Sequence, residues 1–207
     1  MRAIVPYRAV DPKTRLNSVL DDDERAAFAR VMLRTVLTTL REGGHEPTVL
    51  STAPLDEDAL PAAASVVVDD RPLTAAVNDQ LAAETPTLIV MADLPLATPD
   101  AIRRLIATSD DIAIAPGLGG GTNALVVREP AFRVDYHGAS YLDHLAAAAD
   151  LDATVSVVDS RRLATDIDEP SDLAEVLIHG DGPARAWLVD AGFELDTGDG
   201  RVGVRRR

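Results

Sequence analysis

The stretch Thr87-Leu-Ile-Val-Met-Ala-Asp93-Leu-Pro95 holds the most apolar run of the 207-residue chain and ends in a carboxylate and a turn. Its first six residues predict a buried strand over 87–92. Thr98-Pro99-Asp100 then opens a helix with a cap, a proline at the first helical position and an acidic first turn. A buried strand followed at once by a helix is the repeating unit of an α/β fold.

The same alternation extends in both directions along the chain. Further strands are predicted over 2–7, 48–51, 65–68, 111–115, 123–127 and 154–158. Further helices are predicted over 21–41, ending at Gly43-Gly44, and over 73–83, 140–149 and 171–178. The fold class is therefore α/β, with a mainly parallel, mixed sheet flanked by helices. We expect a single domain over 1–207, with a core over about 1–178 and an extension over 179–207 that forms a helix plus a short hairpin or a loosely held tail.

The charge balance excludes several functions. The net charge is −14, with 25 Asp against 9 Glu and a single lysine, Lys13. So negative a chain lacks the basic surface that nucleic-acid binding needs. No apolar run is long enough to span a bilayer, and the absence of cysteine excludes disulfides and thiolate metal sites. We expect a cytoplasmic protein, and its Asp-rich, Lys-poor composition resembles that of halophile proteins.

Three cations follow the first predicted strand within eight residues: Arg8, Lys13 and Arg15. In open α/β sheets, ligands bind beyond the carboxyl ends of the strands. Arginine and lysine side chains there suit a triphosphate. The alternative is a solvated loop whose charges are balanced by Asp11 and by the acidic run 21–23.

Carboxylates occur at two further places that suit a metal ion. Asp93 ends the most apolar strand, where a carboxylate is costly without a positive partner. Asp166 and Asp168 are two residues apart, so both point to one side of an extended segment. Carboxylates and phosphate oxygens are the ligands that Mg²⁺ prefers. The alternative is that these residues serve in turns and helix caps.

A glycine-rich segment, 117–121, leads into Thr122 and Asn123. Glycines let backbone amides converge on an anion, and the two polar side chains could add hydrogen bonds. Ser140 could cap a helix whose N-terminus faces the same anion. The alternative is a flexible connection. His137 and His144 are scattered and have no cysteine partner, so a zinc site is not expected.

These segments together resemble one family, the 2-phospho-L-lactate guanylyltransferases. These are small GT-A/Rossmann-like nucleotidyltransferases of coenzyme F-420 biosynthesis, and the acidic composition suggests the halophilic archaeal type. The resemblance covers about residues 1–178. Its motifs are Val5-Pro6 with Lys13-Thr-Arg-Leu16, Asp93-Leu-Pro95, Gly121-Thr-Asn-Ala-Leu125, the pair Ser140 and His144, and Asp166-Ile-Asp168 with Asp172-Leu173.

The resemblance implies a site for two substrates and a metal ion. GTP would lie over the loop after the first strand, with Lys13, Arg15 and Asp93 as the catalytic residues. The implied nucleotide-binding residues are Pro6, Arg8, Lys13, Arg15, Leu73, Thr74 and Asp93. The implied Mg²⁺ ligands are Asp93, Asp166 and Asp168. The implied acceptor-binding residues are Thr122, Asn123, His137 and Ser140.

The sequence leaves more than one candidate for the acceptor and for the class of protein. The family often has glycine where His137 stands, so 2-phospho-L-lactate, phosphoenolpyruvate and 3-phosphoglycerate all remain candidates. A molybdopterin guanylyl- or cytidylyltransferase is disfavoured because residues 6–16 contain no glycine. A non-catalytic nucleotide-binding or regulatory domain could lose the carboxylates that this chain keeps. The resemblance also suggests a homodimer.

Overall fold

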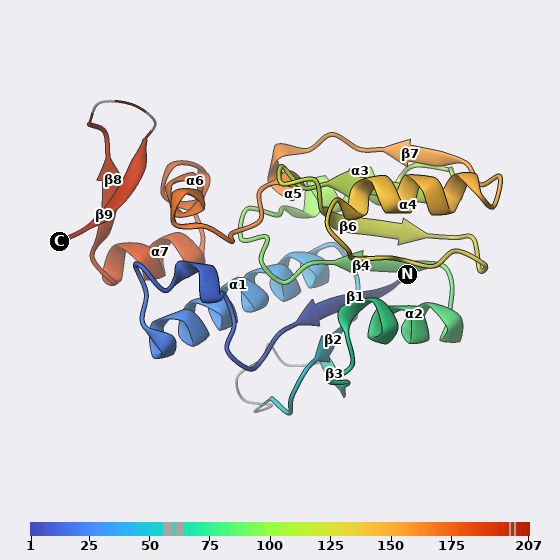
Figure 1. Cartoon of the computed structure of the whole chain (residues 1–207), viewed down its shortest axis with the longest axis horizontal. Helices are drawn as coiled ribbons and strands as arrows, with labels where there is room; N and C mark the ends of the chain where they lie inside the picture. Colours follow the sequence, from blue (N-terminus) through green and yellow to red (C-terminus); the bar gives the residue numbers. More distant parts are fainter. Residues whose placement is uncertain (56–59, 61–63, 199, 201) are drawn as a thin grey trace.

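The computed structural model of the protein describes residues 1–55, 60, 64–198, 200 and 202–207 (Figure 1). In this part of the chain the strands form a seven-stranded sheet and a separate two-stranded hairpin. The strands are β1 (Arg2–Tyr7), β2 (Pro47–Ser51), β3 (Ser65–Val68), β4 (Thr87–Val90), β5 (Ile112–Pro116), β6 (Thr122–Val127), β7 (Val155–Val157), β8 (Phe193–Asp196) and β9 (Gly203–Arg206).

Helices connect most of the strands of the large sheet. They are α1 (Asp22–Glu42), α2 (Leu73–Ala83), α3 (Pro99–Ile106), α4 (Ser140–Ala149), α5 (Arg161–Ala164), α6 (Leu173–His179) and α7 (Pro183–Asp190), with 3₁₀ turns η1 (Thr14–Leu16) and η3 (Pro170–Asp172). Within the described ranges, no helix is long and apolar enough to cross a membrane.

The strand order of the large sheet is β3-β2-β1-β4-β6-β5-β7. Strand β6 runs antiparallel to both of its neighbours, and the other strands run parallel to one another. The prediction of a mainly parallel, mixed sheet is therefore confirmed. Because β6 is reversed, its first residue, Thr122, lies at the same edge of the sheet as the carboxyl ends of β1 and β4.

Apolar side chains alternate between the two faces of the sheet, as the period of a strand requires. Val5, Val49 and Leu88 join a buried cluster with α1 and α3. Their neighbours Ile4 and Ile89 join a second cluster with α2 and α4 on the opposite face. Figure 1 shows α2 and α4 in front of the sheet and α1 behind it. Burial on both faces explains why the strands are nearly continuous apolar runs.

The described part of residues 179–207 forms a helix, α7, and a hairpin of β8 and β9, which is one of the two structures predicted for this extension. Helix α7 packs on α1, where Trp187 stacks on Phe28 with ring centroids 5.0 Å apart. Leu188 and Phe193 are buried in a third cluster with these rings. Arg206 of β9 pairs with Glu24 at the start of α1. The alternative of a loosely held tail is therefore wrong for the described residues of this segment.

Most predicted boundaries lie within two residues of the observed ones. Asp21 caps α1 in a capping box with Glu24, and Gly44 after its end adopts a φ of 81°, in the left-handed region. The helix predicted over 171–178 is the turn η3 followed by α6, and α5 was not predicted. The expectation that Ser140 caps α4 is wrong: the residue at the cap position is Ala139, and the Ser140 hydroxyl accepts a hydrogen bond from Thr122 N at 3.0 Å.

Candidate active site

Residues from distant parts of the chain meet beyond the carboxyl ends of β1 and β4. Asp93 follows β4, and its backbone carbonyl accepts a 3.1 Å hydrogen bond from Ile167 N. Ile167 is fully buried, so Asp166 and Asp168 on either side of it are held next to Asp93. A single backbone contact thus brings the two acidic motifs together.

Lys13 ties two of these carboxylates. Its Nζ lies 2.5 Å from Oδ2 of Asp93 and 2.7 Å from Oδ1 of Asp168, and only 12% of its side chain is exposed. Burial by itself would lower the pKa of Lys13, but the two carboxylates outweigh it and raise that pKa, so the amine is charged. The Lys13 backbone has φ 54° and ψ 42°, a left-handed conformation that non-glycine residues rarely adopt and that gathers at functional sites.

The other two cations of the loop are more open. Arg15 is 62% exposed and pairs with Asp168 at 2.8 Å and Glu169 at 3.3 Å. Arg8 donates from Nε to the carbonyl of Val10 and has no carboxylate partner among the described residues. Asp11, one of the acids expected to balance the loop, pairs instead with the buried Arg25. The loop cations Lys13 and Arg15 are therefore paired with Asp93, Asp168 and Glu169, and not with the nearby acids that the alternative named.

A cavity of about 660 Å³ opens against this loop. The predicted nucleotide-binding residues Pro6, Arg8, Lys13, Arg15, Leu73 and Asp93 line it, together with Asp168. Its other walls include residues that were not predicted: Thr52, Asp69, Arg71, Ala76 and Met91. Asp69 follows β3 directly, so the rule that identified Asp93, a polar residue just after a strand, could have found it.

Asp166 does not line this cavity, but it is fixed beside it. Asn123 donates from Nδ2 to Asp166 Oδ1 at 3.0 Å and to the carbonyl of Leu163 at 2.9 Å. Burial raises the pKa of Asp166, and the nearby charges of Asp93 and Asp168 act in the same direction. Asn123 therefore holds a carboxylate, which differs from the direct acceptor contact that was expected of it.

The three carboxylates meet the requirements for a metal ion only in part. Asp93 Oδ1 is buried and has no hydrogen-bond partner among the described residues, and Asp93 lies close enough to Asp166 to help raise the pKa of Asp166. Within the described residues, however, no group of three acidic or histidine side chains is close enough to enclose an ion, and Lys13 lies between Asp93 and Asp168. The unpaired oxygen of Asp93 fits a divalent ion whose remaining ligands would come from Asp166 and a bound phosphate.

A second polar cluster lies at the start of β6. Thr122 and Ser140 are both buried at 4% exposure, and Thr122 Oγ1 lies 2.9 Å from Nδ1 of His144. Tyr141 N of α4 donates to the carbonyl of Gly120, which holds the glycine segment against the N-terminus of the helix. This cluster combines two hydroxyl groups with a helix N-terminus, a combination suited to an anion.

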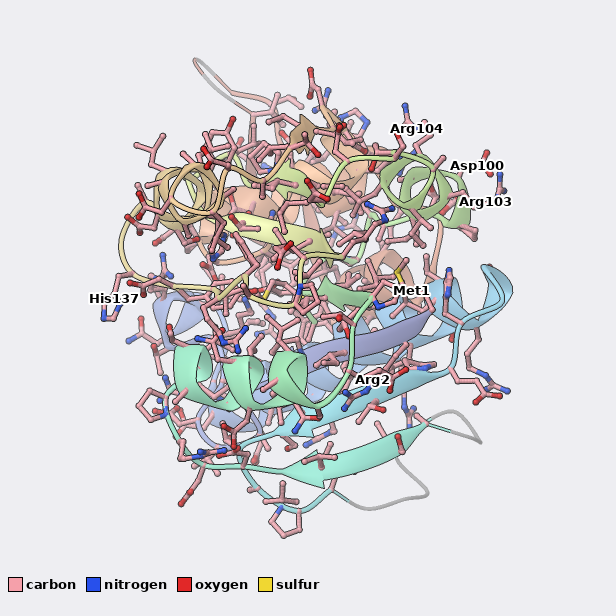
Figure 2. All side chains as sticks on the ribbon, turned by 90° about the vertical axis from the view of Figure 1, so that its right-hand side faces the viewer. Met1, Arg2, Asp100, Arg103, Arg104 and His137 are labelled. Atoms are coloured by element: carbon pink, nitrogen blue, oxygen red, sulfur yellow. The ribbon has the colours of Figure 1, made fainter. Side chains whose placement is uncertain are left out.

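Two predicted residues are placed elsewhere. The His137 imidazole is 85% exposed, pairs with Asp135 at 2.6 Å and projects from the surface in Figure 2, so its side chain does not reach the buried Thr122–Ser140 cluster. Thr74 accepts a hydrogen bond from Tyr136 N at 3.0 Å and does not line the cavity. The Thr74 side chain is thus held away from the predicted nucleotide. The acceptor contact implied by the resemblance is with the backbone near His137, and it stays a prediction.

Comparison with known proteins identifies the family. The family model described as guanylyl transferase CofC like matches residues 1–207. A Halomicrobium mukohataei protein named 2-phospho-L-lactate guanylyltransferase is 57% identical over 207 residues, covering 100% of both chains. A Methanocorpusculum labreanum protein of the same name is 46% identical over 207 residues, covering 99% of this chain and 95% of its own.

Solved structures with less than 25% identity support the fold. A Desulfovibrio desulfuricans protein, provisionally described as a nucleotide-diphospho-sugar transferase, superposes with a TM-score of 0.73 at 17% identity, covering 91% of this chain and 94% of its own. A nucleotidyl transferase from Methanothermobacter has a TM-score of 0.62 at 15% identity, covering 86% and 96%. The resemblance inferred from the motifs is thus confirmed: the chain belongs to the CofC-like guanylyltransferase family.

Proposed function

We propose that the protein transfers a guanylyl group from GTP to 2-phospho-L-lactate, with Mg²⁺ as cofactor and pyrophosphate as the second product. The observation that supports this most directly is one sheet edge that carries a cavity lined by the three cations of the loop after β1, a partly unpaired carboxylate and a separate cluster of two hydroxyl groups. The names of the relatives state the acceptor and the transferred guanylyl group, and GTP is the donor that we propose for that group.

The cavity has two ends that suit the two ends of a nucleotide. Lys13 and Arg15 line one end, and Asp69 and Arg71 line the other, beyond β3. Strand β3 is three strands away from β4, a distance of about 14 Å at the usual strand spacing. The triphosphate lies at the cationic end in our proposal. Guanine lies at the other, where a carboxylate accepts from its amino group and a guanidinium donates to its carbonyl oxygen.

The reaction is a direct displacement. An oxygen of the acceptor phosphate forms a bond to the α-phosphorus of GTP, and the bond from that phosphorus to the bridging oxygen of the β-phosphate breaks. The electron pair leaves with pyrophosphate. A phosphate monoester is already anionic near neutral pH, so no general base is needed. The protein positions the two anions and neutralises charge, the usual work of phosphoryl transfer.

Each cation has a place in this scheme. Arg8, which lacks a carboxylate partner in the described residues, and Arg15 bind the outgoing phosphates. Lys13 is held by Asp93 and Asp168 at the junction between the phosphates and the carboxylates. Asp93 and Asp166 would hold Mg²⁺ together with phosphate oxygens, and Asp168 orients the two cations. The ion, when bound, neutralises negative charge on the phosphates.

The acceptor binds at Thr122 and Ser140 in this proposal. Phosphoenolpyruvate and 3-phosphoglycerate present a similar carboxylate and phosphate, and they are the competing acceptors. The product formed from 2-phospho-L-lactate or from phosphoenolpyruvate would serve coenzyme F-420 biosynthesis. We further propose that the protein works in a cytoplasm of high salt, in keeping with its net charge of −14 and its single lysine. A homodimer is a separate proposal, which rests on the family resemblance.

Pyrophosphate release tests the function. The protein is incubated with GTP and Mg²⁺ at high salt, and 2-phospho-L-lactate, phosphoenolpyruvate or 3-phosphoglycerate is added in turn. We expect release that depends on the acceptor and is fastest with 2-phospho-L-lactate. Faster release with another of these acceptors would identify that acceptor as the substrate. GTP binding without pyrophosphate release for any acceptor would contradict the proposal.

A further inference from the structure

His144 is a fully buried histidine for which the proposed reaction has no direct use. It lies on α4, and both of its ring nitrogens have partners. Nε2 is 3.1 Å from the backbone nitrogen of Asp135, and Nδ1 is 2.9 Å from Oγ1 of Thr122. The imidazole therefore bridges the loop before α4 and the first residue of β6.

These partners determine the position of the ring proton. A backbone amide can only donate, so Nε2 must accept from Asp135 and cannot carry hydrogen. Burial lowers the pKa of His144 to about 4, which keeps the ring neutral at the pH of a cell. A neutral ring without hydrogen on Nε2 has it on Nδ1, which then donates to the Thr122 hydroxyl oxygen.

The same argument leaves two hydroxyl hydrogens available. Thr122 Oγ1 accepts from His144, and Ser140 Oγ accepts from Thr122 N. Neither hydroxyl donates to an acceptor among the described residues. Each oxygen is thus held in place by a protein N–H, while its own hydrogen remains free for a ligand. Both free donors suit an anionic oxygen.

Several contacts fix the imidazole itself. The Tyr136 ring meets it edge to face at 86°, with centroids 5.2 Å apart. Asn78 of α2 bonds both the nitrogen and the carbonyl of Val134, at 2.8 and 3.0 Å. The segment that presents Asp135 N to the ring is therefore anchored to α2, the helix that supplies Leu73 and Ala76 to the nucleotide cavity. Rotation of the ring would leave a backbone amide unpaired.

We propose that His144 is a positioning residue for the acceptor: by donating from Nδ1 it holds the Thr122 hydroxyl so that this hydroxyl gives its hydrogen to an anionic oxygen of the acceptor. This inference rests on the proposed function, because it assigns the acceptor to the Thr122–Ser140 cluster. His144 itself does not touch the substrate.

Two amide substitutions separate the two hydrogen bonds of the ring. In His144→Asn the amide nitrogen takes the place of Nδ1 and still donates to Thr122. In His144→Gln the amide oxygen takes the place of Nε2 and accepts from Asp135, but the donation to Thr122 is lost. We expect His144→Gln to raise KM for the acceptor about tenfold with KM for GTP within twofold, and His144→Asn to stay within about threefold of wild type.

Thr122→Val supplies the matched comparison. It removes the hydroxyl, so adding His144→Gln to it should raise the acceptor KM by less than twofold further. An acceptor KM unchanged in His144→Gln, equal increases for GTP and acceptor, or additive losses in the double variant would each overturn the proposal.

The wild-type protein provides a test that needs neither a variant nor turnover. The ¹⁵N chemical shifts of the His144 ring show which nitrogen carries hydrogen, and a proton on Nε2 would overturn the proposal. If the wild type releases no pyrophosphate, the proposed function fails separately. Calorimetric titration with inorganic phosphate then decides the inference: weaker binding by His144→Gln supports it, and equal binding overturns it.

Discussion

Nζ of Lys13 lies between Oδ2 of Asp93, at 2.5 Å, and Oδ1 of Asp168, at 2.7 Å. One ammonium group thus joins the end of β4 to the segment before α6. Its removal leaves two neighbouring carboxylates with no cation between them, at the point where the triphosphate binds in our proposal. The resulting repulsion between the carboxylates would weaken the binding of an anionic ligand more than it would lower the stability of the fold.

We therefore expect Lys13→Met to lower kcat/KM for GTP about 100-fold, because one charge that faces the phosphates is lost. Steady-state pyrophosphate release measures this. Arg104→Met is the control, since Arg104 projects into solvent from α3 (Figure 2) and its loss should leave the rate within twofold. Comparable losses in the two variants would point to net charge, and not to the Lys13 contacts.

Asp93→Asn should abolish turnover, with a loss of at least about 100-fold, while the melting temperature stays within a few degrees. The amide keeps the volume of the side chain but cannot bind a divalent ion as a carboxylate does. Asp100→Asn is the control, because Asp100 is exposed at the first turn of α3 and pairs with the likewise exposed Arg103. Full activity of Asp93→Asn at saturating Mg²⁺ would rule out Asp93 as a metal ligand.

Asp69→Asn should change the choice of nucleotide. An amide presents both a donor and an acceptor, so discrimination of guanine from adenine should weaken by about 10- to 100-fold in the ratio of kcat/KM for GTP and ATP. The neighbouring Asp70→Asn, at an exposed position, should leave the ratio unchanged. An unaltered ratio in Asp69→Asn would move guanine recognition to another wall of the cavity.

His144 should make the protein less stable at mildly acidic pH. Burial lowers its pKa to about 4, and the carboxylates of Asp135 and Asp143 only partly oppose this. Between that value and about 6.5 the unfolded chain binds a proton that the native ring does not, so stability falls as the pH drops. The buried ring packs against Tyr136 and Phe132, which cannot titrate in this range.

The expected contribution is about 2 kcal/mol of unfolding free energy lost between pH 7 and pH 5. Urea unfolding of wild type and His144→Asn at both pH values measures it. The variant lacks the group, so the difference in stability between the two proteins should shrink by that amount at pH 5. A constant difference would mean that the native ring titrates near its ordinary pKa.

Trp187→Ala should lower the free energy of unfolding by about 3 kcal/mol, because it removes the ring that stacks on Phe28 and joins α7 to α1. Val189→Ala, on the same helix at 48% exposure, should cost less than about 0.5 kcal/mol. Denaturant unfolding compares them. If the C-terminal segment melts in a separate transition, the contact of α7 with α1 contributes little to the main domain.

The strands and the positions of the acidic motifs could be predicted because their signals are local. The run 87–92 is apolar at every position, and Asp93 comes directly after it. The order of the sheet could not be predicted, since nothing in residues 122–127 distinguishes a reversed strand from a parallel one. The reversal depends on the short glycine connection from β5, which leaves no room for a crossover helix.

The hydrogen-bond partners of the side chains within the site could not be predicted from the sequence either. Nothing in the sequence around His137 and His144 distinguishes an exposed histidine from a buried one. In the structure His137 is exposed beside Asp135, whereas His144 is enclosed by β6, Tyr136 and the loop before α4. Asn123 was expected to bind the acceptor, and its hydrogen bond to Asp166 was not foreseen. Such roles depend on contacts across tens of residues, and no spacing rule encodes them.

The position of β4 between the two halves of the sheet has an evolutionary consequence. The walls of the nucleotide cavity come largely from residues 6–92, and the anion cluster comes from residues 117–144. If these are the nucleotide and acceptor sites, as we propose, separate and consecutive stretches of the gene encode the two specificities. Recombination between relatives near the codon of Asp93 could exchange one substrate while the other is inherited unchanged.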